Sequence, residues 1–156
     1  MRGTKYSGSW KVLVVLVVMT STFTIVSGNK ECSCPTRNAS HPRTIVIGGS
    51  NNWEVNATNY TMWAFRNGPY FDGDVLVFKY NNDHNVVEMP DSESFEKCNV
   101  TGAKVLGSTK DGSGEGFKFT LKASLKLYFL ACGQANGVHC GLGQMKLPFF
   151  VLPRPH

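Results

Sequence analysis

The stretch KLYFLACGQANGVHCGLGQMKLPFFVL, which runs from Lys126 to Leu152, places a glycine-rich loop between two runs of β-forming residues. The first run ends directly before Cys132, and the second begins at Lys146. β-Branched and aromatic residues favour strands, whereas glycine and asparagine favour the turns between them. The stretch therefore predicts two strands joined by a loop that opens at Cys132.

Similar runs lie upstream of this stretch, and each is bounded by turn residues. They are Thr44–Ile47, Val75–Tyr80 and Gly116–Leu121, the last with apolar and polar residues in alternation. Such alternation is typical of a strand with one buried face. The best helical candidate is the short segment Asn59–Phe65, with Asn59 as its N-cap. Regularly spaced short strands in a chain of this size predict an all-β fold, a sandwich or a barrel.

The first 28 residues have the pattern of a secretory signal peptide. Basic residues precede an apolar run over Val12–Val18, and small residues precede an expected cleavage after Gly28. The apolar run is shorter than the roughly 20 residues that a membrane-spanning helix needs. We therefore expect a signal peptide over residues 1–28, an irregular arm over 29–42, one domain over 43–152 and a tail over 153–156.

Removal of the signal peptide would also change the charge. Three of the 16 Lys and Arg residues lie within it and none of the 11 acidic residues does, so the net charge falls from +5 to +2. That balance, without a basic run interleaved with aromatic residues, argues against nucleic-acid binding. Residues 151–156 lack the hydrophobic tail of a GPI signal. Four glycosylation sequons fit export: Asn38, Asn56, Asn59 and Asn99. We expect a soluble, secreted monomer.

The cysteines point to chemistry at the glycine-rich loop. The five are Cys32, Cys34, Cys98, Cys132 and Cys140. An odd number in an exported protein leaves at least one thiol without an internal partner. Cys132 ends a predicted strand, and the loop behind it then presents His139 and Met145. One thiolate, imidazole and a weak thioether are the ligands of a blue-copper site, which needs a second histidine.

His84 is the candidate for the second histidine. It follows the Asn-Asn-Asp turn at residues 81–83 and precedes Val86 and Val87, so it lies where a strand resumes. His41, in the predicted arm, and His156, at the terminus, lack such a framework.

Several motifs, taken in order, resemble those of the phytocyanins, the plant cupredoxins that include plantacyanins, stellacyanins, uclacyanins and early nodulin-like proteins. The resemblance covers roughly residues 43–152. It rests on Gly48-Gly49, Trp53, Tyr60, Trp63-Ala64, Gly73–Phe78, Tyr80, His84–Glu88, Cys98-Asn99, Tyr128-Phe129, His139-Cys140 and Met145–Leu147.

The resemblance implies a Greek-key β-sandwich with one or two short helices. It makes His84, Cys132 and His139 the equatorial ligands of one type 1 copper ion, and Asn85 a residue that ties the two ligand-bearing segments together. It also implies a Cys98–Cys140 disulfide. From the residues alone a Cys98–Cys132 pairing stays open, although it would remove the thiolate. Cys32 and Cys34 pair with each other or between chains.

The chain departs from the family pattern in two places. The six residues between Cys132 and His139 make a longer loop than is typical of phytocyanins. The usual spacing from His139 to the axial ligand lands on Gln144, whereas side-chain type and the following Lys146-Leu147 favour Met145. We expect Met145 to be the axial ligand, with Gln144 as the alternative.

Three functions remain to be compared. The first is one-electron transfer by copper to an unidentified redox partner in the plant cell wall, without enzymatic activity. The second is a copper-free, early nodulin-like binding or structural module of the cell wall. The third is a hydrolase with Cys132 as nucleophile and His139 as base. It lacks an evident group to orient the base, and a free thiolate would oxidise outside the cell.

Overall fold

The structure is a computed structural model that describes residues 40–122 and 124–155. The predicted signal peptide, most of the predicted arm, Cys32, Cys34 and Asn38 lie outside the described residues. No helix within the described ranges is long and apolar enough to cross a membrane.

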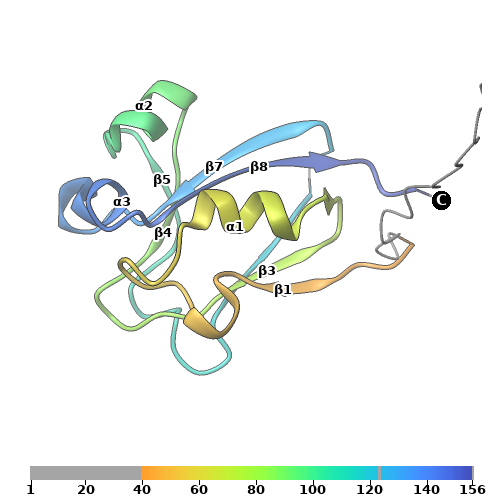
Figure 1. The fold of residues 1–156 in the computed structure, drawn as a ribbon, viewed down its shortest axis with the longest axis horizontal. Helices are drawn as coiled ribbons and strands as arrows, with labels where there is room; N and C mark the ends of the chain where they lie inside the picture. Colours follow the sequence, from red (N-terminus) through yellow and green to blue (C-terminus); the bar gives the residue numbers. More distant parts are fainter. Residues whose placement is uncertain (1–39, 123, 156) are drawn as a thin grey trace, which may run out of the picture. The chain divides into compact units, whose positions relative to one another are not determined.

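Two sheets form the framework (Figure 1). The smaller has the strand order β1-β3-β6, and the larger has the order β2-β8-β7-β4-β5. β1 pairs with β3 and β2 with β8 in parallel, whereas the remaining pairs are antiparallel. The strands are β1 (Thr44–Val46), β2 (Tyr70–Phe71), β3 (Val75–Phe78), β4 (Val86–Glu88), β5 (Lys104–Gly107), β6 (Phe117–Thr120), β7 (Lys126–Ala131) and β8 (Lys146–Leu152).

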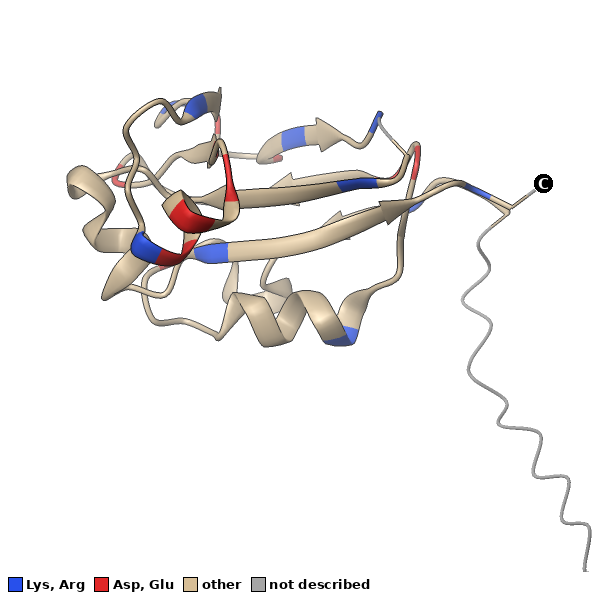
Figure 2. Cartoon of the chain, turned by 90° about the horizontal axis from the view of Figure 1, so that it is seen from above, with Lys and Arg blue, Asp and Glu red and all other residues tan. Residues whose placement is uncertain are grey.

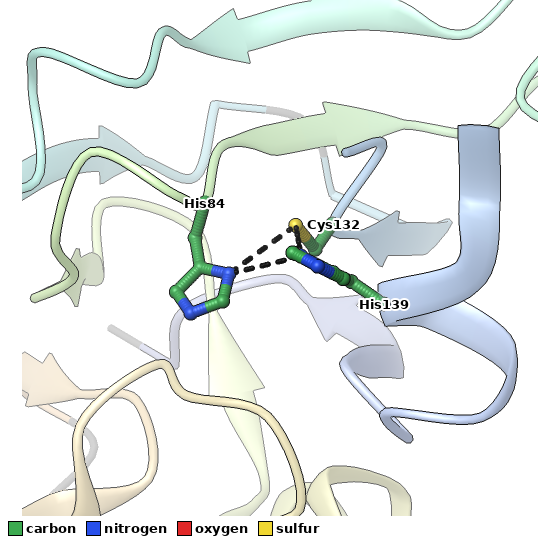
Figure 3. A group of neighbouring side chains, drawn as sticks. All are labelled: His84, Cys132 and His139. Atoms are coloured by element: carbon green, nitrogen blue, oxygen red, sulfur yellow. Dashed lines mark hydrogen bonds between the residues drawn. The ribbon is translucent and has the colours of Figure 1, made fainter. Parts of the chain in front are cut away.

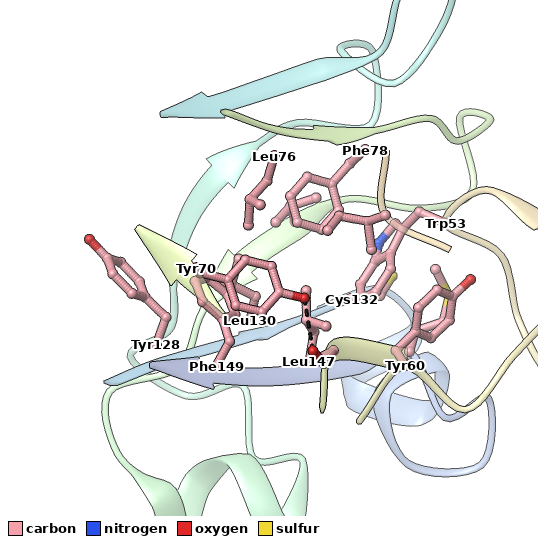
Figure 4. Packing of buried hydrophobic residues seen from close by; sticks show 14 of the residues in the cluster. Trp53, Tyr60, Tyr70, Leu76, Phe78, Tyr128, Leu130, Cys132, Leu147 and Phe149 are labelled. Carbon is pink, nitrogen blue, oxygen red and sulfur yellow. Dashed lines mark hydrogen bonds between the residues drawn. The ribbon is translucent and has the colours of Figure 1, made fainter. Parts of the chain in front are cut away.

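The core between the sheets is apolar and aromatic (Figure 4). Trp53, Phe78 and Leu130 are fully buried, and the ring of Trp53 meets that of Phe78 edge-on with centroids 5.3 Å apart. Cys132 and Met145 belong to the same buried cluster. The predicted β-sandwich is therefore confirmed, and the sulfur-bearing residues of the predicted site belong to its core.

Short helices lie beside the sheets. Helix α1 (Tyr60–Asn67) begins where the Asn59 side chain accepts a hydrogen bond from the Met62 N–H, as predicted, and packs against β8. Two further helices are α2 (Ser92–Lys97) and α3 (Val138–Gly141), and 3-10 turns span Gly49–Asn51 (η1) and Ala135–Gly137 (η2). In Figure 1, α2 and α3 lie at the opposite end of the sandwich from the C-terminus.

Charges of both signs are dispersed over the described strands and helices (Figure 2). Acidic and basic residues occur together even on the short helix α2, where Lys97 pairs with Glu93. Among residues 40–122 and 124–155, the one fully buried carboxylate is that of Asp74, which bonds to Arg43 and Arg154. This cluster ties the start of β1 and the segment after β8 to β3.

Candidate metal centre

Cys132 is positioned by the pairing of β7 with β8. β7 ends at Ala131, and the next backbone N–H, that of Cys132, donates to the carbonyl of Met145 over 3.0 Å. The Cys132 side chain is fully buried, and it is the one free thiol among the described cysteines. The pairing of β7 with β8 therefore holds the Cys132 thiol at the end of β7.

His139 is carried by the four-residue helix α3, which other segments hold in place. The neighbouring Cys140 forms a disulfide with Cys98, the pairing that the family resemblance implies. Gly137, just before α3, has a φ of +85°, and a Cβ there would lie 2.2 Å from the Cys98 carbonyl oxygen. Only glycine allows this close approach. The long loop is thus closed against the end of α2.

His84 lies at the entrance to β4. The Asn81 side chain accepts from the Asp83 N–H, and the Asn81 carbonyl accepts from the His84 N–H, so the turn at residues 81–83 is internally bonded. The His84 side chain is only 2% exposed. A buried imidazole in a bonded turn is a rigid donor.

The three predicted equatorial ligands meet at one point (Figure 3). Nδ1 of His84 lies 3.1 Å from Nδ1 of His139, and the Cys132 Sγ lies 3.9 Å and 3.6 Å from these two atoms. The circle through the three atoms has a radius of about 2.1 Å, and first-row metals bind imidazole and thiolate at about 2.0–2.3 Å. An ion at its centre would be at bonding distance from all three. The donor set fits copper.

Asn85 connects the two ligand-bearing segments. Its side-chain oxygen accepts from the Gly133 N–H over 2.7 Å, directly after Cys132. Its carbonyl accepts from the Trp53 indole N–H over 3.0 Å. Asn85 therefore connects the His84 segment with the Cys132 segment, as the resemblance implies. Its bond to Trp53 attaches the Trp53 segment to the same residue.

The two candidate axial residues lie in different environments. Met145 is fully buried, its N–H donates to the His139 carbonyl, and its own carbonyl accepts from the Cys132 N–H. Gln144 is exposed and has a φ of +56°, and its side-chain amide donates to the Gly141 carbonyl over 2.7 Å. Burial beside the ligands favours Met145, since the Gln144 amide is engaged at the surface.

Burial also sets the electrostatics of the sulfur. Desolvation raises the pKa of the Cys132 thiol above its usual value, although hydrogen bonds from the backbone of Asn85 and Gln134 oppose the shift. Without a metal the sulfur therefore stays a protonated thiol over a wider pH range. A bound cation would reverse this preference, because a coordinating thiol is deprotonated.

Sequence reasoning missed one residue of the site, Glu54. Its Oε1 lies 2.7 Å from Nε2 of His84, and it also accepts from the Val55 N–H over 3.1 Å. Burial alone would raise the pKa of Glu54, but these hydrogen bonds and the two nearby histidines lower it below its usual value. No signal in the sequence marked Glu54, because its partner His84 lies 30 positions away.

The remaining predicted site residues lie apart from the metal centre. The sequon residues Asn56, Asn59 and Asn99 are exposed, and Asn59 also caps α1. His41 is exposed near the start of the described chain, and His156 lies outside the described residues.

The fold and the site define a cupredoxin-like protein with a His-Cys-His centre, and comparison with known proteins agrees. The model of the plastocyanin-like domain matches residues 53–144. Cucumber stellacyanin, solved with Cu²⁺, superposes with a TM-score of 0.60 at 25% identity, over 74% of this chain and 99% of its own. Cucumber basic protein, a blue copper protein, gives 0.50 at 28% identity, over 70% and 99%.

Curated relatives point to the same family. Early nodulin-like protein 12 of Arabidopsis thaliana is 33% identical over 73% of this chain and 57% of its own length. Basic blue protein of the same plant is 44% identical over a shorter stretch, 44% of this chain and 50% of its own. The chain thus spans less than two thirds of these relatives. It belongs to the phytocyanin family.

Proposed function

We propose that this protein transfers single electrons through one copper ion held by His84, Cys132, His139 and Met145. The observation that carries the proposal is the separation of only 3.1–3.9 Å between two imidazole nitrogens and the Cys132 sulfur, so that one ion could reach all three. Two imidazoles and one thiolate are donors of a blue-copper site, and Met145, which is buried and bonded through its backbone to the Cys132 and His139 segments, would offer a weak thioether donor.

The protein's own part in this function is to hold the metal-binding side chains in a fixed arrangement. The copper would cycle between Cu(II) and Cu(I) when bound. Met145 joins the Cys132 and His139 segments through its backbone, and Asn85 joins the His84 segment to Gly133. These hydrogen bonds hold the donors in one arrangement for both oxidation states. His139 is the only one of the three that is not fully buried, so it is the ligand from which an electron would leave to a partner.

A copper-free role is the second candidate, because early nodulin-like proteins stand beside basic blue protein among the curated relatives. Early nodulin-like proteins 12, 14 and 15 match this chain at 33%, 31% and 29% identity. Against it stands the preserved donor triad, since a purely structural module has no need for a free buried thiol between two histidines. Copper content of the purified protein separates the two functions.

Hydrolytic chemistry at Cys132 is disfavoured by its surroundings. A nucleophilic cysteine is partly exposed and has a lowered pKa, because the thiolate is the attacking species. Cys132 is fully buried, and burial raises its pKa. We therefore propose an electron carrier rather than an enzyme, exported by its N-terminal segment and acting outside the cell. The exposure of three of its sequon asparagines is consistent with export.

Voltammetry of the copper-loaded protein tests the proposal. We expect one reversible one-electron wave whose oxidised form is blue and whose reduced form is colourless. Copper that binds stoichiometrically but gives no reversible wave would refute electron transfer, and a protein that retains no copper would favour the copper-free role.

A further inference from the structure

We propose that Glu54 is a positioning residue for the metal, which sets the tautomer of His84 and biases the site toward Cu(II). This rests on the proposed copper site and goes beyond it, since the resemblance assigns Glu54 no role. The carrying observation is the 2.7 Å contact between the Glu54 carboxylate and Nε2 of His84, the ring nitrogen that faces away from Cys132. Figure 3 shows the two nitrogens of this ring turned in different directions.

The chemistry of the two groups decides which atom carries the proton. An ionised carboxylate only accepts hydrogen bonds, so Nε2 of His84 must donate. A neutral imidazole carries a single ring proton, and Nδ1 is then left with a free lone pair. Nδ1 is the atom that lies 3.1 Å from Nδ1 of His139 and 3.9 Å from the Cys132 sulfur. Glu54 therefore presents the ligand atom of His84 in the form that binds a metal.

Glu54 is itself held in place before any metal arrives. The buried Tyr60 hydroxyl accepts from the Glu54 N–H over 2.7 Å and lies within hydrogen-bond distance of the carbonyls of Asn52 and Glu54. The Val55 N–H donates to the same carboxylate oxygen that contacts His84. The backbone of Asn56 donates to the carbonyl of Gly143, behind the His139 helix. The carboxylate thus belongs to a segment attached to both histidine segments.

The charge of Glu54 has a second consequence. A carboxylate hydrogen-bonded to a ligating imidazole raises the basicity of that ligand, which stabilises the more highly charged metal ion. Loss of such a partner typically weakens metal binding 10- to 100-fold. The Glu54 side chain is 46% exposed and lines an open depression of about 490 Å³ with Asp83 and His139, so water screens its charge. We therefore expect an effect near tenfold.

The first arm of the test is independent of copper. In the metal-free protein, nitrogen NMR of the histidine rings should show His84 as the Nε2–H tautomer. Glu54→Leu, which removes the acceptor, should give a mixture of tautomers, whereas Glu54→Gln, whose amide oxygen still accepts, should restore the Nε2–H form. An unchanged tautomer in Glu54→Leu would overturn the proposal. So would a Glu54→Gln variant that behaves like Glu54→Leu.

The second arm measures copper. Glu54→Leu should raise the Kd for Cu(II) about tenfold and leave the Kd for Cu(I) nearly unchanged. A tenfold change in the ratio of these two constants corresponds to an upward shift of about 59 mV in the one-electron reduction potential. Asp83→Asn is the matched control, because Asp83 lines the same depression and the structure gives it no hydrogen bond to a ligand histidine. Equal shifts in both variants would overturn the positioning role. A wild-type protein without copper affinity would refute the carrier function, while the tautomer experiment would still decide the role of Glu54.

Discussion

The residues of the metal centre differ in how far they could be predicted. Cys132, His139 and His84 could be singled out because thiol and imidazole are uncommon donors. Cys132 directly follows one β-rich run, His84 precedes another, and His139 lies in the loop that opens at Cys132. Glu54 could not, because its partner His84 is 30 positions away and a carboxylate after a tryptophan has no pattern of its own. In the sequence, spacing favoured Gln144 and side-chain type favoured Met145. The structure adds that Met145 is buried and that the Gln144 amide bonds to the Gly141 carbonyl.

The axial residue can be tested by matched substitutions. Met145→Leu is nearly isosteric, so it should cost less than about 1.5 kcal/mol of stability. Loss of the weak thioether donor should raise the copper potential, because the axial ligand tunes it. Gln144→Ala should leave the potential unchanged, since that side chain bonds to the Gly141 carbonyl. Voltammetry of both variants decides; a shift in Gln144→Ala alone would assign the axial position to Gln144.

Among the elements, those with a long apolar pattern were predictable and those made by tertiary contacts were not. β7 and β8 have the bounds predicted from sequence, and α1 begins after the predicted N-cap. β2 has only two residues and exists through its pairing with β8. Helix α3 lies within a glycine-rich loop, where local propensity disfavours a helix. Helix α3 is positioned instead by the Cys98–Cys140 disulfide and by the close packing of Gly137 against the Cys98 carbonyl.

The disulfide should affect both stability and the metal. A cross-link between residues 42 positions apart contributes about 4 kcal/mol in the chain-entropy model. The double variant Cys98→Ala/Cys140→Ala should lose a stability of that order in denaturant unfolding. It should also bind copper more weakly, because α3 carries His139. Unchanged copper affinity in the folded double variant would contradict the role given to this clamp.

Gly137 offers a test of the same loop with the disulfide intact. Gly137→Ala would force a Cβ toward the Cys98 carbonyl oxygen at a positive φ, so α3 must shift or strain. We expect a lower melting temperature and a weaker copper site. Gly114→Ala is the control, because it also has a positive φ but no atom lies within 4 Å of its added Cβ. If both variants behave alike, close packing of Gly137 is not what positions the loop.

For the whole molecule, the sequence predicted a β-sandwich but not the parallel strand pairs that join its distant segments. The parallel pairs β1–β3 and β2–β8 join segments distant in sequence, and no local pattern encodes them. The cluster of Asp74 with Arg43 and Arg154 likewise became visible only in three dimensions. Burial would raise the pKa of Asp74, but hydrogen bonds from Arg43, Arg154 and the Phe71 N–H lower it below its usual value.

This cluster makes stability depend on pH in one direction. A carboxylate with a lowered native pKa stabilises the fold above its unfolded pKa of about 4, and the contribution is lost as the pH falls through the native pKa. Asp74→Asn should therefore cost about 3 kcal/mol at neutral pH. It should also lose less stability than wild type between about pH 5 and about pH 2. Thermal unfolding across this range measures both effects; equal acid sensitivity in the variant would rule out Asp74 as a source.

The most direct test of the copper site is a titration of the metal-free protein with Cu(II), followed by visible and EPR spectroscopy, for wild type and for Cys132→Ser. The wild type should bind one equivalent and turn blue through a thiolate-to-copper charge-transfer band. The Cys132→Ser variant, with unchanged fold by circular dichroism, should show no such band. A wild-type protein that stays colourless, or a serine variant that stays blue, would contradict the assignment of Cys132, His84 and His139 as copper ligands.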